Sequence, residues 1–215
     1  MSEFLDYLSF RRDHLIDLAL EHVQVVGFSM AIATTLGVLL GILVYRTDRA
    51  ARVVLGITGA FLTVPSFALF ALLIPIFGLG FQPTVVALVM YALLPIVRNT
   101  ITGLRGVDAA VTESAKGMGM STLQRLFRTE LRLAWPVVVA GIRVSTVMIV
   151  GIAAIAAAVN GPGLGEDIFA GLARIGSPTA LHLVLGGTLG VILIALVLDG
   201  VLLAIGRLTT SRGLR

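Results

Sequence analysis

The sequence contains no cysteine among its 215 residues, so it can form neither a disulfide bond nor a thiolate metal site. Charged residues are also scarce: they make up 13% of the chain, whereas about a quarter of an ordinary soluble domain is charged. Hydrophobic residues make up 57%, and the mean hydropathy is +1.01. Most of the surface must therefore face lipid, and we expect one membrane domain over residues 1–215.

The sequence also lacks the motif G-x-x-x-x-G-K-[ST], which cradles nucleotide phosphates in many ATPases. The chain cannot hydrolyse ATP by that route, so we expect neither enzyme activity nor a bound cofactor. The histidines His14, His22 and His182 are scattered, and we interpret them as interfacial polar residues rather than metal ligands. Residues 160–167 are rich in glycine but follow no strand, so we expect a turn or re-entrant segment there.

Five apolar segments are candidates for transmembrane helices, because about 20 apolar residues span a bilayer core. We place them at residues 23–45, 53–77, 83–104, 134–159 and 183–205. The apolar run of the third segment is short, because it ends at Arg98. Its helix must therefore continue past this arginine or lie where the bilayer is thinner. The predicted fold class is an all-α membrane protein with about five transmembrane helices.

The distribution of Lys and Arg predicts the orientation, because cytoplasmic loops carry the excess of these residues. One side of the expected spans holds twelve, and the other side holds three. The twelve are Arg46, Arg49, Arg52, Arg98, Arg105, Lys116, Arg125, Arg128, Arg132, Arg207, Arg212 and Arg215; the three are Arg11, Arg12 and Arg174. We expect a plasma-membrane protein with its N-terminus outside and its C-terminus in the cytoplasm.

The N-terminal stretch does not resemble a cleaved signal peptide, because residues 1–21 carry five acids against only two arginines. Its apolar residues recur at roughly helical spacing. We therefore expect residues 1–21 to form a plain surface helix, with a helix lying along the membrane surface as the alternative, and the first span to stay in the mature protein.

The expected cytoplasmic loop, residues 105–132, is too long for a simple connection. Asp108 can cap a helix over residues 109–116, and Gly117 and Gly119 then interrupt it. The loop is therefore predicted to begin with one short helix.

A second helix is predicted to begin at Ser121, which forms the S-x-x-Q capping box with Gln124. Its apolar face comprises Leu123, Leu126, Phe127 and Leu131, and its basic face comprises Arg125, Arg128 and Arg132. These faces suit an anionic membrane surface. A helix-turn-helix can also bind DNA, but this one is tied to spans at both ends and has no second basic face, so we expect no nucleic acid. Docking of a partner protein and a plain structural loop both fit.

The segment Glu113-Ser114-Ala115, followed by Gly119, resembles the E-A-A-x-x-x-G signature of binding-protein-dependent ABC permeases. In that family this loop is a coupling helix that enters a cleft of a separate ATPase. Ser114 replaces the first of the two alanines, and Arg132 stands where the family has a proline. The resemblance implies a permease fold like that of methionine importers. It assigns the ATPase contacts to Glu113, Ser114, Ala115, Gly117 and Gly119.

Other stretches resemble the branch of this family that imports glycine betaine, choline, carnitine or proline. They include T-V-P-S at 63–66, Y-A-L-L-P-I-V-R-N-T at 91–100, G-M-G-M at 117–120, A-G-I-R at 140–143 and G-L-G at 163–165. The resemblance implies a permease subunit that works with two cytoplasmic ATPases, a second permease copy or paralogue, and an external substrate-binding protein. ATP would be used by the ATPases alone.

Three other functions are alternatives. A sister branch of the same family imports amino acids or methionine. A self-contained secondary transporter would be expected to show coupling charges deep in the spans or an internal repeat, and neither is evident. A membrane scaffold is disfavoured by the kinked spans and the coupling loop.

Two prolines, Pro65 and Pro75, interrupt the second expected span and free backbone carbonyls. Such backbone is tolerated in a membrane where it lies beside a cavity or is buried in protein. We therefore expect this span to line the translocation path, although kinked helices also occur as packing features. The candidate path residues are Thr63, Pro65, Ser66 and Phe67, with Asn99 near the cytoplasmic mouth.

Arg143 and Asp199 lie inside spans, where ionisable residues are usually paired or reach water. Both lie roughly 10 to 12 Å from the cytoplasmic ends of their helices, at 1.5 Å per residue. This matched depth predicts an ion pair that fixes the last two spans, and the alternative is that Arg143 extends to the interface. Small-residue pairs that favour close helix packing occur at Gly37 with Gly41 and at Gly186 with Gly190.

Overall fold

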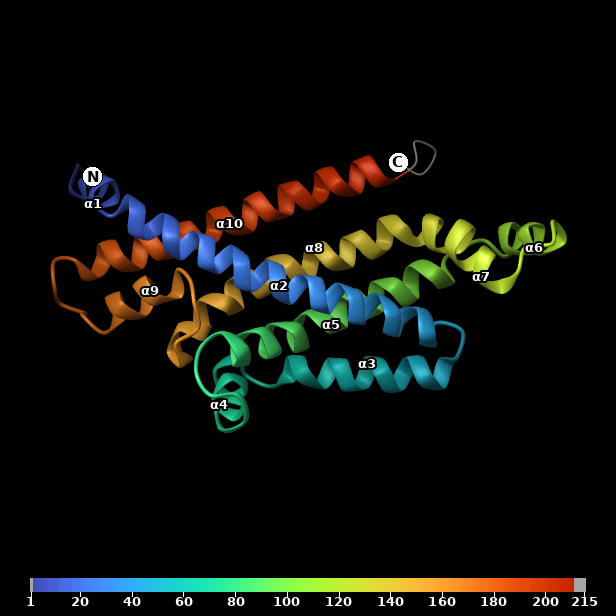
Figure 1. Ribbon diagram of the computed structural model, residues 1–215, viewed down its shortest axis with the longest axis horizontal. Helices are drawn as coiled ribbons and strands as arrows, with labels where there is room; N and C mark the ends of the chain where they lie inside the picture. The colour runs from blue at the N-terminus through green and yellow to red at the C-terminus, as the bar shows by residue number, and fades with distance from the viewer. Residues whose placement is uncertain (1, 211–215) are drawn as a thin grey trace.

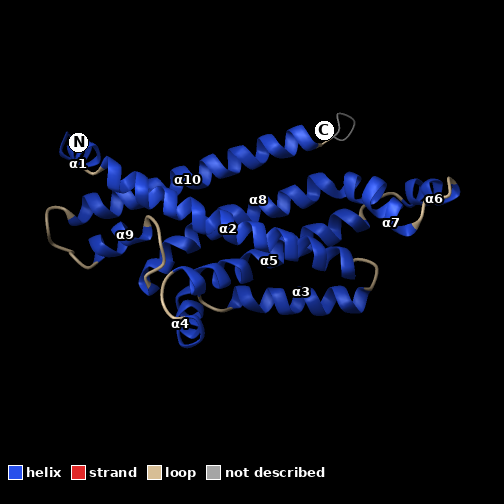
Figure 2. Cartoon of the chain, viewed as in Figure 1, coloured by secondary structure: helices blue, strands red, loops and turns tan. Residues whose placement is uncertain are grey.

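The computed structural model describes residues 2–210, and the regular elements in that range are all helical (Figure 2). They are α1 (Ser2–Phe10), α2 (Arg12–Val44), α3 (Asp48–Thr63), α4 (Ser66–Phe77), α5 (Phe81–Arg105), α6 (Ala109–Gly117), α7 (Thr122–Arg125), the π-helical turn η1 (Leu126–Glu130), α8 (Leu131–Ile155), the 3₁₀ turn η2 (Ala156–Val159), α9 (Gly165–Leu172) and α10 (Ala180–Thr209).

The long helices run along one axis of an elongated bundle (Figure 1). The helices α6 and α7 project at one end, which we call the α6 end. The start of the chain and α9 lie at the opposite end, which we call the α9 end. The long helices therefore connect two ends of the bundle that lie far apart.

Within residues 2–210, four helices are long and apolar enough to cross a membrane. They are Arg12–Val44, Phe81–Arg105, the continuous helix Thr122–Val159, and Ala180–Thr209. The bent pair of α3 and α4 would make a fifth crossing if it forms one span. This agrees with the predicted class of an all-α membrane protein with about five spans.

Helix α5 forms the centre of the bundle and packs against α2, α3, α4 and α8. Close approach of α2 depends on two glycines: a Cβ on Gly37 would lie 2.7 Å from Ile96, and one on Gly41 would lie 2.6 Å from Thr100. Real Cβ atoms essentially never approach another heavy atom below 3.0 Å. The small-residue pair in α2 therefore serves helix packing.

The first span differs from the prediction of a separate surface helix over residues 1–21. Only α1 is separate, because α2 begins at Arg12 and continues without interruption to Val44. No glycine or proline occurs before Gly27 to end the helix. His22 is fully buried, and its Nε2 lies 3.1 Å from the carbonyl oxygen of Val150. The interpretation of His22 as an interfacial residue is therefore wrong.

The second expected span, residues 53–77, is not one straight helix. Helix α3 ends at Thr63 and α4 begins at Ser66, with a bend of 99° between them. Pro65 forces the preceding residue out of the helical region, and Val64 has ψ 126°. The Tyr91 hydroxyl donates a hydrogen bond of 2.7 Å to the Val64 carbonyl, so α5 supplies a partner to the backbone at the break.

The glycine-rich segment 160–167 forms a turn that leads into α9. Gly163 has φ +113°, in the left-handed region that favours glycine. A Cβ on Gly165 would lie 2.0 Å from the Ala154 carbonyl oxygen, so α9 touches the backbone of α8 at this point. The expected turn therefore covers only the first half of the segment, and Glu166 and Asp167 lie in the first turn of α9.

Candidate functional site

Helix α6 is capped as the sequence predicts. The Asp108 side chain accepts a hydrogen bond of 2.8 Å from the Ala110 backbone N–H, and the helix runs from Ala109 to Gly117. Glu113 and Ser114 are both exposed, whereas Ala115 is only 2% exposed. The helix therefore buries its small residue and presents a carboxylate and a hydroxyl on the outside of the bundle end.

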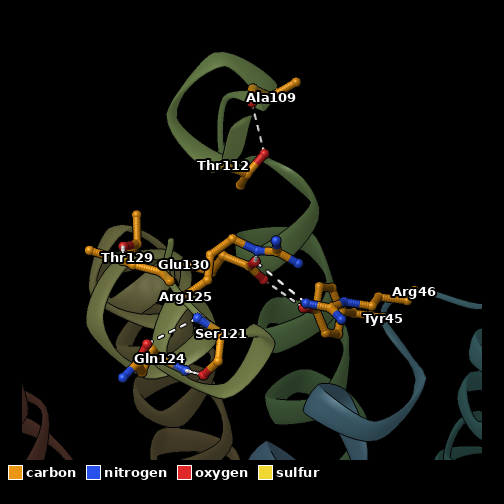
Figure 3. Close-up of polar contacts among 10 residues, drawn as sticks. Tyr45, Arg46, Ala109, Thr112, Ser121, Gln124, Arg125, Thr129 and Glu130 are labelled. Atoms are coloured by element: carbon orange, nitrogen blue, oxygen red, sulfur yellow. Dashed lines mark hydrogen bonds and ion pairs between the residues drawn. The ribbon is translucent and has the colours of Figure 1, made fainter. Parts of the chain in front are cut away.

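The predicted capping box is also present (Figure 3). The Ser121 N–H donates to Gln124 Oε1 at 2.9 Å, and the Gln124 N–H donates to Ser121 Oγ at 3.3 Å. The second helix does not stand apart, however, because α7 continues through η1 into α8.

The predicted apolar and basic faces of this second helix are only partly present. Leu126 is buried, but Leu123 and Phe127 are 66% and 57% exposed. On the basic side, Arg125 points into the protein and bonds to Glu130, whereas Arg128 is exposed.

Glu130 is the centre of a polar network at the α6 end (Figure 3). Its side chain is only 5% exposed. The Tyr45 hydroxyl donates to Glu130 Oε2 at 2.5 Å, and Arg125 Nε donates to Oε1 at 2.8 Å. Arg46 lies 3.5 Å from Oε1 and also donates to the Tyr45 hydroxyl at 2.6 Å. One buried carboxylate thus joins the end of α2 to the helical stretch α7–η1.

The π-helical turn places Arg125 and Glu130 on the same side. In a regular α-helix, residues five apart differ by roughly 140° around the axis and would not meet. In η1 the Leu131 N–H bonds to the Leu126 carbonyl, an i to i+5 contact that widens the turn. The inserted residue therefore allows the arginine and the glutamate of one helix to meet.

The network continues to α5. Arg105 Nε donates to the Tyr45 carbonyl at 2.7 Å, and its Nη2 lies 2.9 Å from Asp48 Oδ1. A cavity of about 290 Å³ separates this cluster from α6. Its lining residues are Tyr45, Arg46, Leu104, Thr112, Glu113, Lys116, Arg125 and Glu130. The glutamate of α6 and the buried Glu130 thus border one cavity.

The candidate path residues are only partly brought together. Thr63, Pro65, Ser66 and Phe67 surround the break between α3 and α4, and the Phe67 side chain is 60% exposed. Asn99 lies about 12 Å further along α5 than Tyr91, which contacts the break. Its Nδ2 donates to the Pro95 carbonyl at 2.8 Å within the same helix. Asn99 is therefore not part of the group around Pro65.

Arg143 and Asp199 meet between α8 and α10. Arg143 Nε and Nη2 each donate to one oxygen of the Asp199 carboxylate, both at 2.8 Å. About a third of each side chain is exposed, 30% for Arg143 and 34% for Asp199. The two-pronged contact orients both side chains and connects α10 to α8 within the apolar part of the bundle.

Comparison with known proteins identifies the family. The family described as "Binding-protein-dependent transport system inner membrane component" matches residues 33–210, which is most of the chain. The chain belongs to this family. Its members are the membrane components of transporters that also use a binding protein, so the chain is a permease component of such a system.

Two relatives match this permease component over nearly its whole length. The "Choline transport system permease protein OpuBB" of Bacillus subtilis (strain 168) is 36% identical over 215 residues, covering 100% of this chain and 97% of the relative. The "Osmoprotectant import permease protein OsmW" of Salmonella typhimurium (strain LT2) is 37% identical over 216 residues, covering 98% and 99%.

A solved structure of the inward-facing MetNI methionine ABC transporter contains a chain with the same fold. Its TM-score is 0.80 at 23% identity, and the match covers 98% of the permease component and 100% of the solved chain. This likeness confirms the predicted fold like that of methionine-importer permeases.

Sequence reasoning missed Glu130 and Tyr45 as functional candidates in this permease component. One signal was available: Glu130 is the only acid between Glu113 and Glu166, and it lies among basic residues. An isolated carboxylate in such a stretch indicates an ion pair. Its partner Tyr45 could not be found from the sequence, because the two residues are 85 positions apart.

Proposed function

We propose that this chain is the permease subunit of an ABC importer for compatible solutes such as glycine betaine, choline, carnitine or proline. The observation that carries the proposal is the full-length similarity to relatives named for choline transport and osmoprotectant import. A third relative, 35% identical over 215 residues, is a glycine betaine/carnitine/choline permease of Bacillus subtilis. The chain would form the translocation path and would itself bind no cofactor.

The proposed complex contains two cytoplasmic ATPases, a second permease copy or a paralogue, and an external substrate-binding protein. Helix α6 docks on the ATPase, which uses the ATP. The support is that α6 projects from the end of the bundle (Figure 1) and presents Glu113 and Ser114 of the family signature at its surface. Gly119 has φ +80°, which lets the chain reverse directly after α6.

The proposed orientation places the α6 end in the cytoplasm and the N-terminus outside. Support comes from the excess of Lys and Arg, because segments that face the cytoplasm carry more of these residues. Arg46, Arg105 and Arg125 all lie in the polar network at the α6 end. Arg11, by contrast, contacts Asp167 at the α9 end.

The translocation path is proposed to run along the break between α3 and α4. Thr63, Pro65 and Phe67 are exposed in the single chain, so they are available to face a second permease subunit across a path. Ser66, which begins α4, lies between them. Asn99 is proposed at the cytoplasmic mouth of the path, because it lies nearer the α6 end than the break between α3 and α4 does.

Uptake measurements test the choice of solute. The full complex is reconstituted in vesicles with its ATPase and binding protein, and uptake of labelled betaine, choline, carnitine, proline and methionine is compared. We expect uptake of at least one compatible solute and none of methionine. Uptake of methionine alone would favour the second candidate, a methionine importer, to which the solved neighbour belongs.

Substitution of Glu113 tests the docking of the ATPase. We expect Glu113→Lys to abolish co-purification of the ATPase, because the change reverses the charge of this α6 side chain. Glu166→Lys is the matched control, since Glu166 is an exposed glutamate in the helix at the opposite end. Full ATPase recovery with Glu113→Lys would contradict the assignment of α6.

A further inference from the structure

We propose that Glu130 is the positioning residue that couples movement of the α6–α7 loop to α2. This proposal rests on the proposed function, because it assumes that an ATPase moves α6. Glu130 belongs to η1, directly between the loop and α8, and its carboxylate bonds to the end of α2. It therefore lies where a displacement of the loop must enter the transmembrane helices.

Because Glu130 is buried, separating its carboxylate from its donors is energetically costly. Its side chain is 5% exposed, and its two oxygens are shared among Tyr45, Arg46 and Arg125. A buried carboxylate that loses its donors is left as an unpaired charge, which is unfavourable in an apolar surrounding. The end of α2 and the α7–η1 stretch must consequently move together.

Apolar packing also connects η1 to α2 and α5. Leu126, the first residue of η1, is buried with Val44 at the end of α2 and with Leu104 near the end of α5. The cavity of about 290 Å³ that α6 borders is also lined by Glu130 and Tyr45. Helix α6 packs against α7 and η1, and Glu130 holds η1 to the end of α2, so a displacement of α6 reaches α2 through η1.

The proposal predicts a specific defect in transport. When the Glu130 contact is weakened, α6 still docks and the ATPase still works, but less of its movement reaches α2. Solute uptake then falls while ATP hydrolysis continues. A residue with only a role in stability would lower both quantities together, or would prevent assembly of the complex.

The test uses the complete complex in vesicles and measures solute uptake per ATP hydrolysed. Tyr45→Phe removes one hydrogen bond to the carboxylate but keeps the ion pair with Arg125, and Glu130→Gln removes the charge. We expect each variant to lower the ratio by about tenfold, the factor associated with one lost hydrogen bond to a charged group. The double variant should be no worse than the more affected single variant, since both act on one contact.

Thr209→Val is the matched control, because it removes the hydrogen bond that Trp135, five residues after Glu130, donates to α10, and this contact involves none of the partners of Glu130. It should leave the ratio unchanged. If Glu130→Gln does not fold, Tyr45→Phe carries the test. An unchanged ratio in Tyr45→Phe, or a parallel loss of uptake and hydrolysis, would overturn the proposal. Failure of the unmodified chain to retain an ATPase would instead overturn the proposed function.

Discussion

The contact between α9 and α8 yields a sharp prediction about stability. A Cβ on Gly165 would lie 2.0 Å from the Ala154 carbonyl oxygen and 2.8 Å from its carbonyl carbon. Both are backbone atoms of α8, so no side-chain rotation can relieve the clash. Since contacts below 3.0 Å are essentially never seen for real Cβ atoms, α9 must move away by about 1 Å. Gly165→Ala should therefore destabilise the fold by about 1 to 3 kcal/mol.

Gly151→Ala is the matched control for this prediction. Gly151 lies one turn earlier in α8, is exposed, and has no atom within 4 Å of the position that a Cβ would take. The change there adds helix propensity, about 1 kcal/mol. With about 2 to 4 °C per kcal/mol for a chain of this size, Gly165→Ala should lower the melting temperature by about 2 to 12 °C and Gly151→Ala should raise it slightly.

The assay is thermal unfolding of the purified full chain in detergent, followed by size-exclusion chromatography of the remaining folded protein. Equal melting temperatures for the two variants would refute the close contact between α8 and α9.

Two further predictions concern the spans and the loop. Asp199→Asn should lower the melting temperature by about 2 to 4 °C, because a polar contact between membrane helices contributes about 1 kcal/mol. Exchanging the two charges in the double variant Arg143→Asp/Asp199→Arg should recover more than half of this loss, and no recovery would contradict a direct pair. Ser121→Ala removes the capping box and should raise hydrogen exchange of the Gln124 amide roughly fivefold, equivalent to about 1 kcal/mol; unchanged exchange would show that the cap does not hold this turn.

Features that depend on near neighbours in the sequence could be predicted. The α6 helix and the capping box follow from Asp108 and from the pair Ser121 and Gln124, whose partners lie two or three residues away. The long apolar segments likewise identify the spans, because apolar composition alone is enough to place a helix in lipid. Depth from the helix end was also sufficient to suggest that Arg143 and Asp199 face each other.

Features that depend on distant contacts could not be predicted. The burial of His22 arises from Gly163, whose Cβ position lies 2.8 Å from the His22 ring, and nothing in the sequence around the histidine indicates that neighbour. The same is true of Glu130, which needs both the π-helical turn and Tyr45. The 99° bend at Pro65 was foreseeable as an interruption, but its size is set by the packing of α4 against α5.

A second buried carboxylate, Asp167, lies at the α9 end of the bundle. Its Oδ1 accepts from Arg11 at 3.0 Å and lies 3.4 Å from His14 Nε2, and its Oδ2 accepts from the Tyr7 hydroxyl at 3.4 Å. Burial and the charge of Asp167 raise the pKa of Tyr7 above its ordinary value of 10.0, so the hydroxyl stays protonated and can donate. This cluster ties the start of α2 to α9, which follows α8 and η2.

The two carboxylates together hold α2 at both ends. Glu130 precedes α8 and holds the end of α2, whereas Asp167 follows α8 and holds the start of α2. Helix α10 is different, because only 6% of its most apolar stretch is buried and its polar link to α8 within the apolar part is the pair of Arg143 and Asp199. Both ends of α2 are therefore held by buried carboxylates, whereas α10 depends on a partly exposed pair, so a change in the tilt of α2 would displace a buried charge.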